Sequence, residues 1–156
     1  MTQTTHNNNS IGMLRIDLQD SLKQTDLDPR ELSSFQRILL TTDGTVTEIL
    51  EAHLFESMRI VKLYEEQIAT DKAIPYLEVP QGTEVMARKI LLRGKYIHKN
   101  YIYAESLLVP DRLSPQMRDD LLNTRKPIGL LILEARMETF REILSCQREP
   151  MGEIAQ

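Results

Sequence analysis

Two long runs of strand-forming residues, separated by a short connection that contains a glycine, constrain the fold of this 156-residue chain more than any other feature. The first run is Glu84–Arg93, the second is Tyr96–Val109, and Gly94 lies between them. Runs rich in aliphatic, β-branched and aromatic residues are typical of strands, and glycine at a short connection is typical of a hairpin. The pattern predicts an antiparallel pair of strands with Arg93-Gly94-Lys95 at its tip.

Two short helices and a further strand are predicted before this pair. The tetrapeptide Asp28-Pro29-Arg30-Glu31 has its aspartate and proline where a helix start favours them, and an apolar stripe at helical spacing follows. After a break at Asp43-Gly44, Thr45 and Glu48 form a candidate capping box for a second helix. Residues 55–66 have too little helical periodicity to continue that helix and predict a strand.

Shorter elements are predicted after the hairpin. Ser114-Pro115 starts one short helix, and Pro127 starts another that continues to Leu133. The run Met137–Gln147 predicts a further strand, although its composition alone also allows a helix. This order favours an α+β fold with a largely antiparallel sheet over alternating β-α-β units.

The length suits one domain, so we expect a disordered leader over residues 1–10 and a single domain over residues 11–156. A net charge of −4 argues against general nucleic-acid binding, which needs a basic face to release counterions. One cysteine, Cys146, cannot form an internal disulfide. No apolar run approaches the roughly 20 residues of a membrane span, and the start lacks the layout of a signal peptide. We therefore expect a cytoplasmic protein with neither nucleic-acid nor membrane partners.

Arg88 is the most informative anomaly in the strand runs. Period-2 alternation places it on one face with apolar residues such as Met86 and Ile90. A guanidinium on such a face needs a partner, either a protein carboxylate or a bound anion. Glu142 stands in the mirror-image situation on the apolar face of the run 137–147. Spacing alone favours a structural ion pair, between Arg88 and Glu142 or between each of them and another neighbour.

Other chemistry-bearing residues give weaker signals. The histidines lack metal-ligand spacing, Cys146 has no nearby histidine and fits a small core residue, and the glycines form no phosphate-binding loop. No metal site is expected. One hairpin is locally basic, which fits either a solvated hairpin end or a guide for anionic ligands. Its basic residues are Arg88, Lys89, Arg93, Lys95, His98 and Lys99.

Four groups of residues together resemble a known family. They are Arg37-Ile38-Leu39-Leu40 before Asp43-Gly44-Thr45-Val46-Thr47; Arg88-Lys89-Ile90-Leu91-Leu92; Tyr103-Ala104-Glu105-Ser106-Leu107-Leu108-Val109-Pro110; and Lys126-Pro127-Ile128-Gly129, followed by Glu138-Thr139-Phe140-Arg141-Glu142-Ile143. In this order and spacing they resemble the chorismate pyruvate-lyase family, specifically its shorter prokaryotic branch. The resemblance extends from about residue 30 to residue 148.

The resemblance implies a fold, a reaction and a binding site. The fold would be a six-stranded antiparallel sheet with helices on one side and the ligand beneath helical flaps. The reaction would eliminate pyruvate from chorismate and leave 4-hydroxybenzoate, without metal or organic cofactor, as a step of aromatic biosynthesis. Arg88 falls where the family's carboxylate-binding arginine lies. Ile128 and Gly129 fall in the Pro-x-Gly turn, where the N–H at Ile128 helps to hold the same carboxylate.

The chain also departs from the family pattern. Better-known members carry an arginine where this chain has Glu105-Ser106, so Glu105 is either a candidate acid–base group or a surface charge. The family's last two strands, which include a carboxylate near the hydroxyl end of the product, have no counterpart before Gln156. About four strands are therefore expected here, and Glu105 and Glu142 are the candidate catalytic residues. If the chain ends at Gln156, an open sheet edge would be left for a partner, which makes a homodimer possible.

Two other functions remain open at this stage. One is a non-catalytic domain that binds a small aromatic carboxylate, because the same fold resembles the effector-binding half of certain bacterial transcription regulators. The residues before Pro29 are too few and too polar for a helix-turn-helix module. The other is a structural protein in which Arg88 only pairs with a neighbouring carboxylate.

Overall fold

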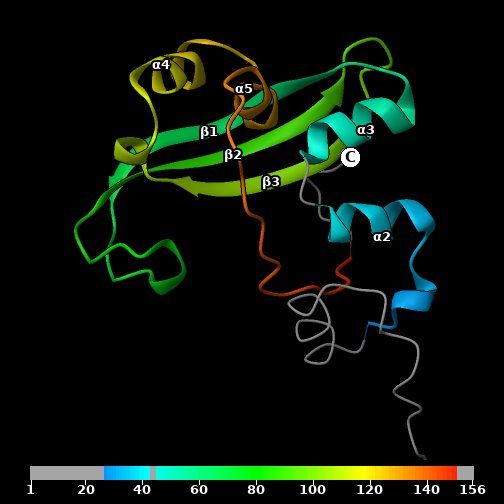
Figure 1. Ribbon diagram of the computed structural model, residues 1–156, viewed down its shortest axis with the longest axis horizontal. Coiled ribbons are helices and arrows are strands. Elements are labelled where there is room, and N and C mark those ends of the chain that lie inside the picture. Colours follow the sequence, from blue (N-terminus) through cyan, green and yellow to red (C-terminus); the bar gives the residue numbers. More distant parts are fainter. Residues whose placement is uncertain (1–26, 43–44, 151–156) are drawn as a thin grey trace, which may run out of the picture. The chain divides into compact units, whose positions relative to one another are not determined.

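The structure is a computed structural model that describes residues 27–42 and 45–150 (Figure 1). These residues belong to two compact units. The first unit contains residues 27–42 and 139–150, and the second contains residues 45–138. The expected leader and the break at Asp43-Gly44 lie outside the described residues, and the single domain over residues 11–156 stays a prediction.

An antiparallel sheet forms the centre of the second unit. It has three strands in the order β1-β2-β3, and both pairings are antiparallel (Figure 1). Their bounds are Met58–Ala69 for β1, Glu84–Gly94 for β2 and Asn100–Leu108 for β3. With the helices described below, this confirms the α+β class and the antiparallel pairing predicted from the sequence. The number of strands is three among the described residues, not about four.

The hairpin tip is longer than the sequence indicated. A five-residue connection, 95–99, joins β2 to β3, and the Gly94 N–H donates to the Lys99 carbonyl at 3.0 Å. The Glu56 carboxylate fixes this connection, because its Oε1 accepts from the N–H groups of Tyr96 at 2.6 Å and Ile97 at 2.7 Å. β3 therefore begins four residues later than the predicted Tyr96.

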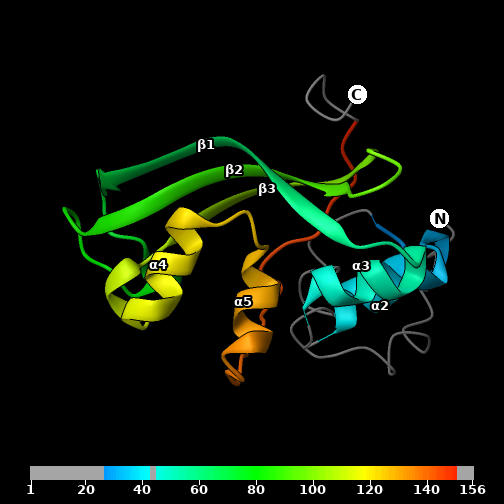
Figure 2. The same ribbon diagram turned by 90° about the horizontal axis from the view of Figure 1, so that it is seen from above.

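Helices cover one face of the sheet. Helix α4 is Pro115–Asn123, with Ser114 as its N-cap, and α5 is Ile128–Glu134, so both predicted helix starts are confirmed. Both helices lie on the same side of the sheet (Figure 2). Their apolar residues form a buried cluster with one strand residue. Its members are Met86 of β2, Met117 and Leu121 of α4, and Leu131 of α5.

The remaining elements of the second unit connect these layers. Helix α3 is Val46–Leu54, and the Thr45 side chain caps it by accepting from the Glu48 N–H at 3.4 Å. Phe55 follows with a φ of 52° and ends α3, so β1 begins at Met58 and not at Phe55 as predicted. Two short 3-10 helices complete the unit. In the sequence, η3 (Pro75–Leu77) lies between β1 and β2, and η4 (Pro110–Arg112) follows β3.

In the first unit, the helix predicted to start at Asp28 is corrected. Asp28 caps only the short 3-10 helix η2, Pro29–Glu31, and α2 (Ser34–Thr41) starts separately. Ser33 and Gln36 form a full capping box there, and this box is the local reason for the new start.

None of the helices in residues 27–42 and 45–150 is long and apolar enough to cross a membrane.

The predicted strand Met137–Gln147 is wrong, because residues 137–150 form neither strand nor helix. The apolar positions that suggested a buried face are open to solvent, with Phe140 83% and Leu144 57% exposed. Side-chain bonds hold the segment instead, since the Arg141 Nη1 donates to the Leu39 carbonyl at 2.6 Å. Alternation of apolar and polar residues does not by itself stabilise a strand, which also needs hydrogen bonds to a neighbouring strand.

Gly94 should be replaceable only at a cost to stability. A Cβ at this position would lie 2.5 Å from the Glu56 Oε2, a separation that real Cβ atoms do not show. We expect Gly94→Ala to lower the free energy of unfolding by about 1–3 kcal/mol, measured by urea denaturation. In a double-mutant cycle with Glu56→Ala the two losses should be less than additive, because the second change removes the clashing carboxylate. Fully additive losses would contradict this explanation.

Candidate functional site

Arg88 lies on the helix-covered face of the sheet. It follows Met86 by two residues on β2, and therefore shares the face that carries the buried cluster. Its side chain is 2% exposed. The sequence thus predicted correctly that this guanidinium lies among apolar residues and needs a partner.

The partner of Arg88 is Glu65 of β1 and not Glu142. The Arg88 Nε donates to the Glu65 Oε2 at 2.8 Å. The other oxygen of the same carboxylate, Oε1, accepts from the Lys62 Nζ at 2.8 Å. Lys62 also donates to the carbonyls of Leu121 and Leu122 near the end of α4, at 3.3 and 3.2 Å. We call Lys62, Glu65 and Arg88 the buried charge triad.

A β-bulge makes the triad possible. Lys62 pairs in register with Ile90 and Tyr64 pairs with Lys89, so Leu63 is an extra residue on β1. Without it, side chains three positions apart on a strand would face opposite sides of the sheet. The extra residue brings Glu65 opposite Arg88, on the same face as Lys62.

The triad carries one more positive than negative charge. Glu65 supplies one carboxylate to two cations, and its own side chain is only 18% exposed. The Arg88 Nη2 is buried and has no hydrogen-bond partner within the described part of the chain. Unpaired buried donors are costly, whereas a carboxylate can accept from a guanidinium in a planar, charge-assisted arrangement. The triad is therefore suited to bind one further anion.

The beginning of α5 lies on the same side of the sheet. Ile128, its first residue, packs against the cluster that contains Met86. Gly129 is buried, and a Cβ there would lie 3.0 Å from the Thr45 Cβ and 3.2 Å from the Thr47 Oγ1. The glycine thus permits α5 to approach the beginning of α3 closely.

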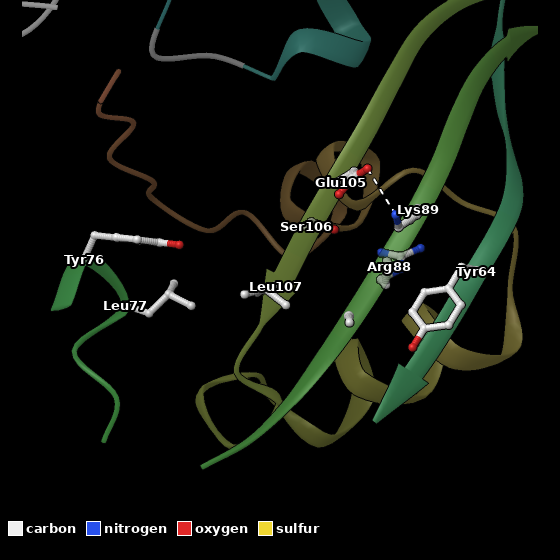
Figure 3. A pocket seen from close by; sticks show the side chains of 9 residues that line it. Tyr64, Tyr76, Leu77, Arg88, Lys89, Glu105, Ser106 and Leu107 are labelled. Atoms are coloured by element: carbon white, nitrogen blue, oxygen red, sulfur yellow. Dashed lines mark ion pairs between the residues drawn. The ribbon is translucent and has the colours of Figure 1, made fainter. Parts of the chain in front are cut away.

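Glu105 lies on the opposite, open face. It pairs in register with Lys89, whereas Ser106 pairs with Arg88. The Tyr103 hydroxyl donates to Glu105, and Lys89 lies 3.3 Å from the carboxylate (Figure 3). Together they hold the pKa of the Glu105 carboxyl below its ordinary value. At neutral pH Glu105 is ionised and can accept a proton but not donate one.

A groove of about 390 Å³ includes part of this open face. Residues of all three strands and of η3 line it (Figure 3). They are Tyr64, Tyr76, Leu77, Ala87, Arg88, Lys89, Glu105, Ser106 and Leu107. Arg88 and Glu105, two residues that the sequence singled out, thus both line the groove from adjacent strands, although the Arg88 side chain turns to the helix-covered face.

The other sequence candidates lie in the first unit or form no cluster. Glu142 belongs to the irregular segment 139–150 of that unit. Burial raises the pKa of the Cys146 thiol, which keeps it protonated and agrees with a packing role. Within residues 27–42 and 45–150, no group of three or more His, Cys, Asp or Glu residues could hold a metal ion.

Sequence reasoning missed Glu65, Lys62 and the place of Ser106 opposite Arg88. Alternation along β1 gives no sign of the pair, because the bulge at Leu63 inverts the faces after it. The missing information was the register of β1 against β2, which a single sequence does not supply.

Comparison with known proteins agrees with the resemblance seen in the sequence. The model of the family described as chorismate pyruvate-lyase Rv2949c-like matches residues 40–155. A chorismate pyruvate-lyase of Mycobacterium leprae is 32% identical over 113 residues, which are 72% of this chain and 54% of the relative. The protein of that name from Mycobacterium tuberculosis is 30% identical over 122 residues, 76% of this chain and 61% of the relative. The chain thus spans little more than half the length of these curated relatives.

Removing Glu65 should destabilise the second unit strongly. Glu65→Ala leaves Arg88 and Lys62 as two uncompensated cations beneath the helices, and we expect a loss of about 3 kcal/mol in the free energy of unfolding. Urea denaturation of Glu66→Ala serves as the matched control, because Glu66 is exposed and, in the part of the chain that the structure describes, its carboxylate accepts only from the Tyr64 hydroxyl. Equal losses for the two variants would contradict the role of the triad.

Proposed function

The chain belongs to the Rv2949c-like chorismate pyruvate-lyase family, and on that basis we propose that it eliminates pyruvate from chorismate to leave 4-hydroxybenzoate. The relatives that carry this name are longer, so the activity of the whole protein is part of the proposal. Chorismate and its product both carry a carboxylate on the ring. A site for this substrate needs a buried cation with an unused hydrogen-bond donor.

The observation that carries the proposal is the Arg88 guanidinium. It is almost fully buried, it gives its Nε to Glu65, and its Nη2 has no partner within the described residues. The excess positive charge of the buried charge triad matches the single negative charge of a ring carboxylate. In the proposed complex Arg88 binds that carboxylate, while Glu65 and Lys62 hold the guanidinium in place.

Ile128 supplies the second proposed contact, through its backbone N–H. No side chain caps α5, so the first N–H groups of this helix are not used by a capping residue. A carboxylate at this point would accept from the Ile128 N–H beside its bond to Arg88. Gly129 would contribute by allowing the close packing of α5 that brings this N–H to the site.

The chemistry asks for positioning and one proton transfer. The bond between the ring carbon and the ether oxygen breaks, and the neighbouring ring carbon that bears the hydroxyl loses its proton. The enolpyruvate that leaves takes up a proton at its methylene carbon and becomes pyruvate. Formation of the aromatic ring drives the step, so a fixed orientation of the substrate supplies much of what the protein must add. The proposal includes no cofactor and assigns the proton transfer to no residue. The catalytic roles expected for Glu105 and Glu142 stay predictions of the sequence, since Glu105 faces the open side of the sheet, away from the Arg88 side chain.

Incubation of the purified protein with chorismate tests the proposal directly. Equal amounts of 4-hydroxybenzoate and pyruvate are expected. Binding of 4-hydroxybenzoate without turnover would instead favour a non-catalytic domain that recognises aromatic carboxylates. If neither turnover nor binding is observed, the buried charge triad is a structural feature only.

The cytoplasmic location, the homodimer and the role in aromatic biosynthesis stay predictions of the sequence.

Arg88→Lys should separate carboxylate recognition from simple charge. Lysine keeps the positive charge beside Glu65 but loses the planar fork, so we expect 4-hydroxybenzoate to bind at least about tenfold more weakly by calorimetry, with kcat/KM falling at least as far. Arg93→Lys on the same strand is the matched control, because the Arg93 Nε already donates to the Asn100 Oδ1. Equal affinity in both variants would rule out Arg88 as the anchor.

Ile128→Pro should show whether the backbone N–H contributes. Proline is tolerated as the first residue of a helix, and Pro127 already has an extended ψ of 143°, which suits a following proline. The variant lacks only the N–H and the original side chain. Ile128→Ala removes the side chain and keeps the N–H. Affinity for 4-hydroxybenzoate should fall about fivefold or more for the proline variant relative to the alanine variant. No difference between them would contradict the contact.

A further inference from the structure

Three large apolar side chains at one end of the sheet are left in solvent. Phe55 is 99% exposed, Tyr96 is 72% exposed and Ile97 is 68% exposed. Phe55 ends α3, and the other two lie in the connection between β2 and β3. We call these three residues the apolar tip. Single exposed apolar residues are ordinary on a protein surface, but a group of three on adjoining loops indicates an interaction site.

Hydrogen bonds join the two loops that carry the apolar tip. The Lys95 N–H donates to the Ser57 carbonyl at 2.9 Å, and Glu56 accepts from the N–H groups of Tyr96 and Ile97. Glu56 itself is 7% exposed. The hairpin connection and the α3–β1 connection thus lie at the same end of the sheet (Figure 1). The apolar residues are presented by a preformed structure and need not be ordered on binding.

The surroundings of the tip carry a small excess of positive charge, in contrast to the net charge of −4 of the whole chain. Arg59, Lys95 and Lys99 are the cations of these loops. The acids are the buried Glu56 and Glu51, whose Oε1 accepts from the Met58 N–H at 2.7 Å. The Lys95 Nζ lies 5.6 Å from the centre of the Tyr96 ring, so this cation lies beside one of the three apolar side chains. The His98 ring also lies here, with its Nδ1 3.1 Å from the Arg59 Nη2.

We propose that the apolar tip docks on an anionic lipid surface. Lysine and arginine next to a membrane are attracted to acidic headgroups, and tyrosine is favoured at the boundary between headgroups and acyl chains. Phe55 and Ile97 would enter that boundary while Lys95 and Lys99 remain at the headgroups. Protruding loop residues with cations around them suit this mode, whereas a protein partner of similar affinity calls for a larger, continuous face. The proposal concerns docking on the surface and not a membrane span.

Tryptophan fluorescence provides the test, because the chain contains no tryptophan. Tyr96→Trp places a single reporter in the apolar tip. Tyr76→Trp is the matched control, since Tyr76 is 67% exposed and lies in the connection from β1 to β2, at the other end of β2. Vesicles of phosphatidylcholine mixed with phosphatidylglycerol should shift the Tyr96→Trp emission to shorter wavelength and leave the control unchanged.

Charge and apolar contributions are separated by two further variants in the Tyr96→Trp background. Lys95→Gln with Lys99→Gln should weaken partitioning onto the mixed vesicles about tenfold or more, and Ile97→Ser should also weaken it severalfold. Added salt should reverse the binding of the Tyr96→Trp variant that carries no further change.

Several results would overturn the proposal. They are the absence of a shift with mixed vesicles, an equal shift with phosphatidylcholine alone, and an equal shift in the Tyr76→Trp control. A shift that depends on protein concentration without vesicles would show instead that a second copy of the chain covers the tip. Each of these emission measurements is independent of chorismate turnover, so its result does not depend on whether the proposed function is correct.

Discussion

Burial of one positive charge organises the second unit. The Arg88 guanidinium lies beneath α4 and α5, where it requires a carboxylate. That carboxylate reaches it only because β1 carries an extra residue at Leu63, which turns Glu65 to the same face. Lys62 then links the carboxylate to the last carbonyls of α4. A polar connection therefore ties the sheet to its covering helix, and within the described residues it leaves the Arg88 Nη2 without a hydrogen-bond partner.

Period-2 alternation gives the two faces of this small sheet different chemistry. Adjacent residues Arg88 and Lys89 point to opposite sides, so the first is buried beneath helices and the second pairs with Glu105 on the open face. The pair on the open face is satisfied by its own neighbours, including the Tyr103 hydroxyl. The buried side keeps excess positive charge, and this difference is why the proposed ligand is assigned to Arg88.

The sequence was a good guide wherever a local signal determined the structure. Gly94 between two strand-forming runs predicted the hairpin, and proline after serine predicted the start of α4. The predictions were wrong where contacts with residues far away in the sequence determined the structure. The run Met137–Gln147 has strand-like alternation but no bonded strand, and its Phe140 and Leu144 side chains are exposed. The tip of the hairpin differs as well, because the Glu56 carboxylate holds a longer connection in place.

By itself, the sequence determined that the chain forms an α+β fold with an antiparallel hairpin, that it resembles one family, and that Arg88 lies on an apolar face in need of a partner. Only the tertiary structure decided that the partner is Glu65, that Glu105 faces the other side, and that Phe55 and the hairpin tip come together. The reason is physical. Hydrophobic alternation and turn chemistry act over a few neighbouring residues, whereas the pairing of buried charges depends on strand register, and a single bulge reverses it.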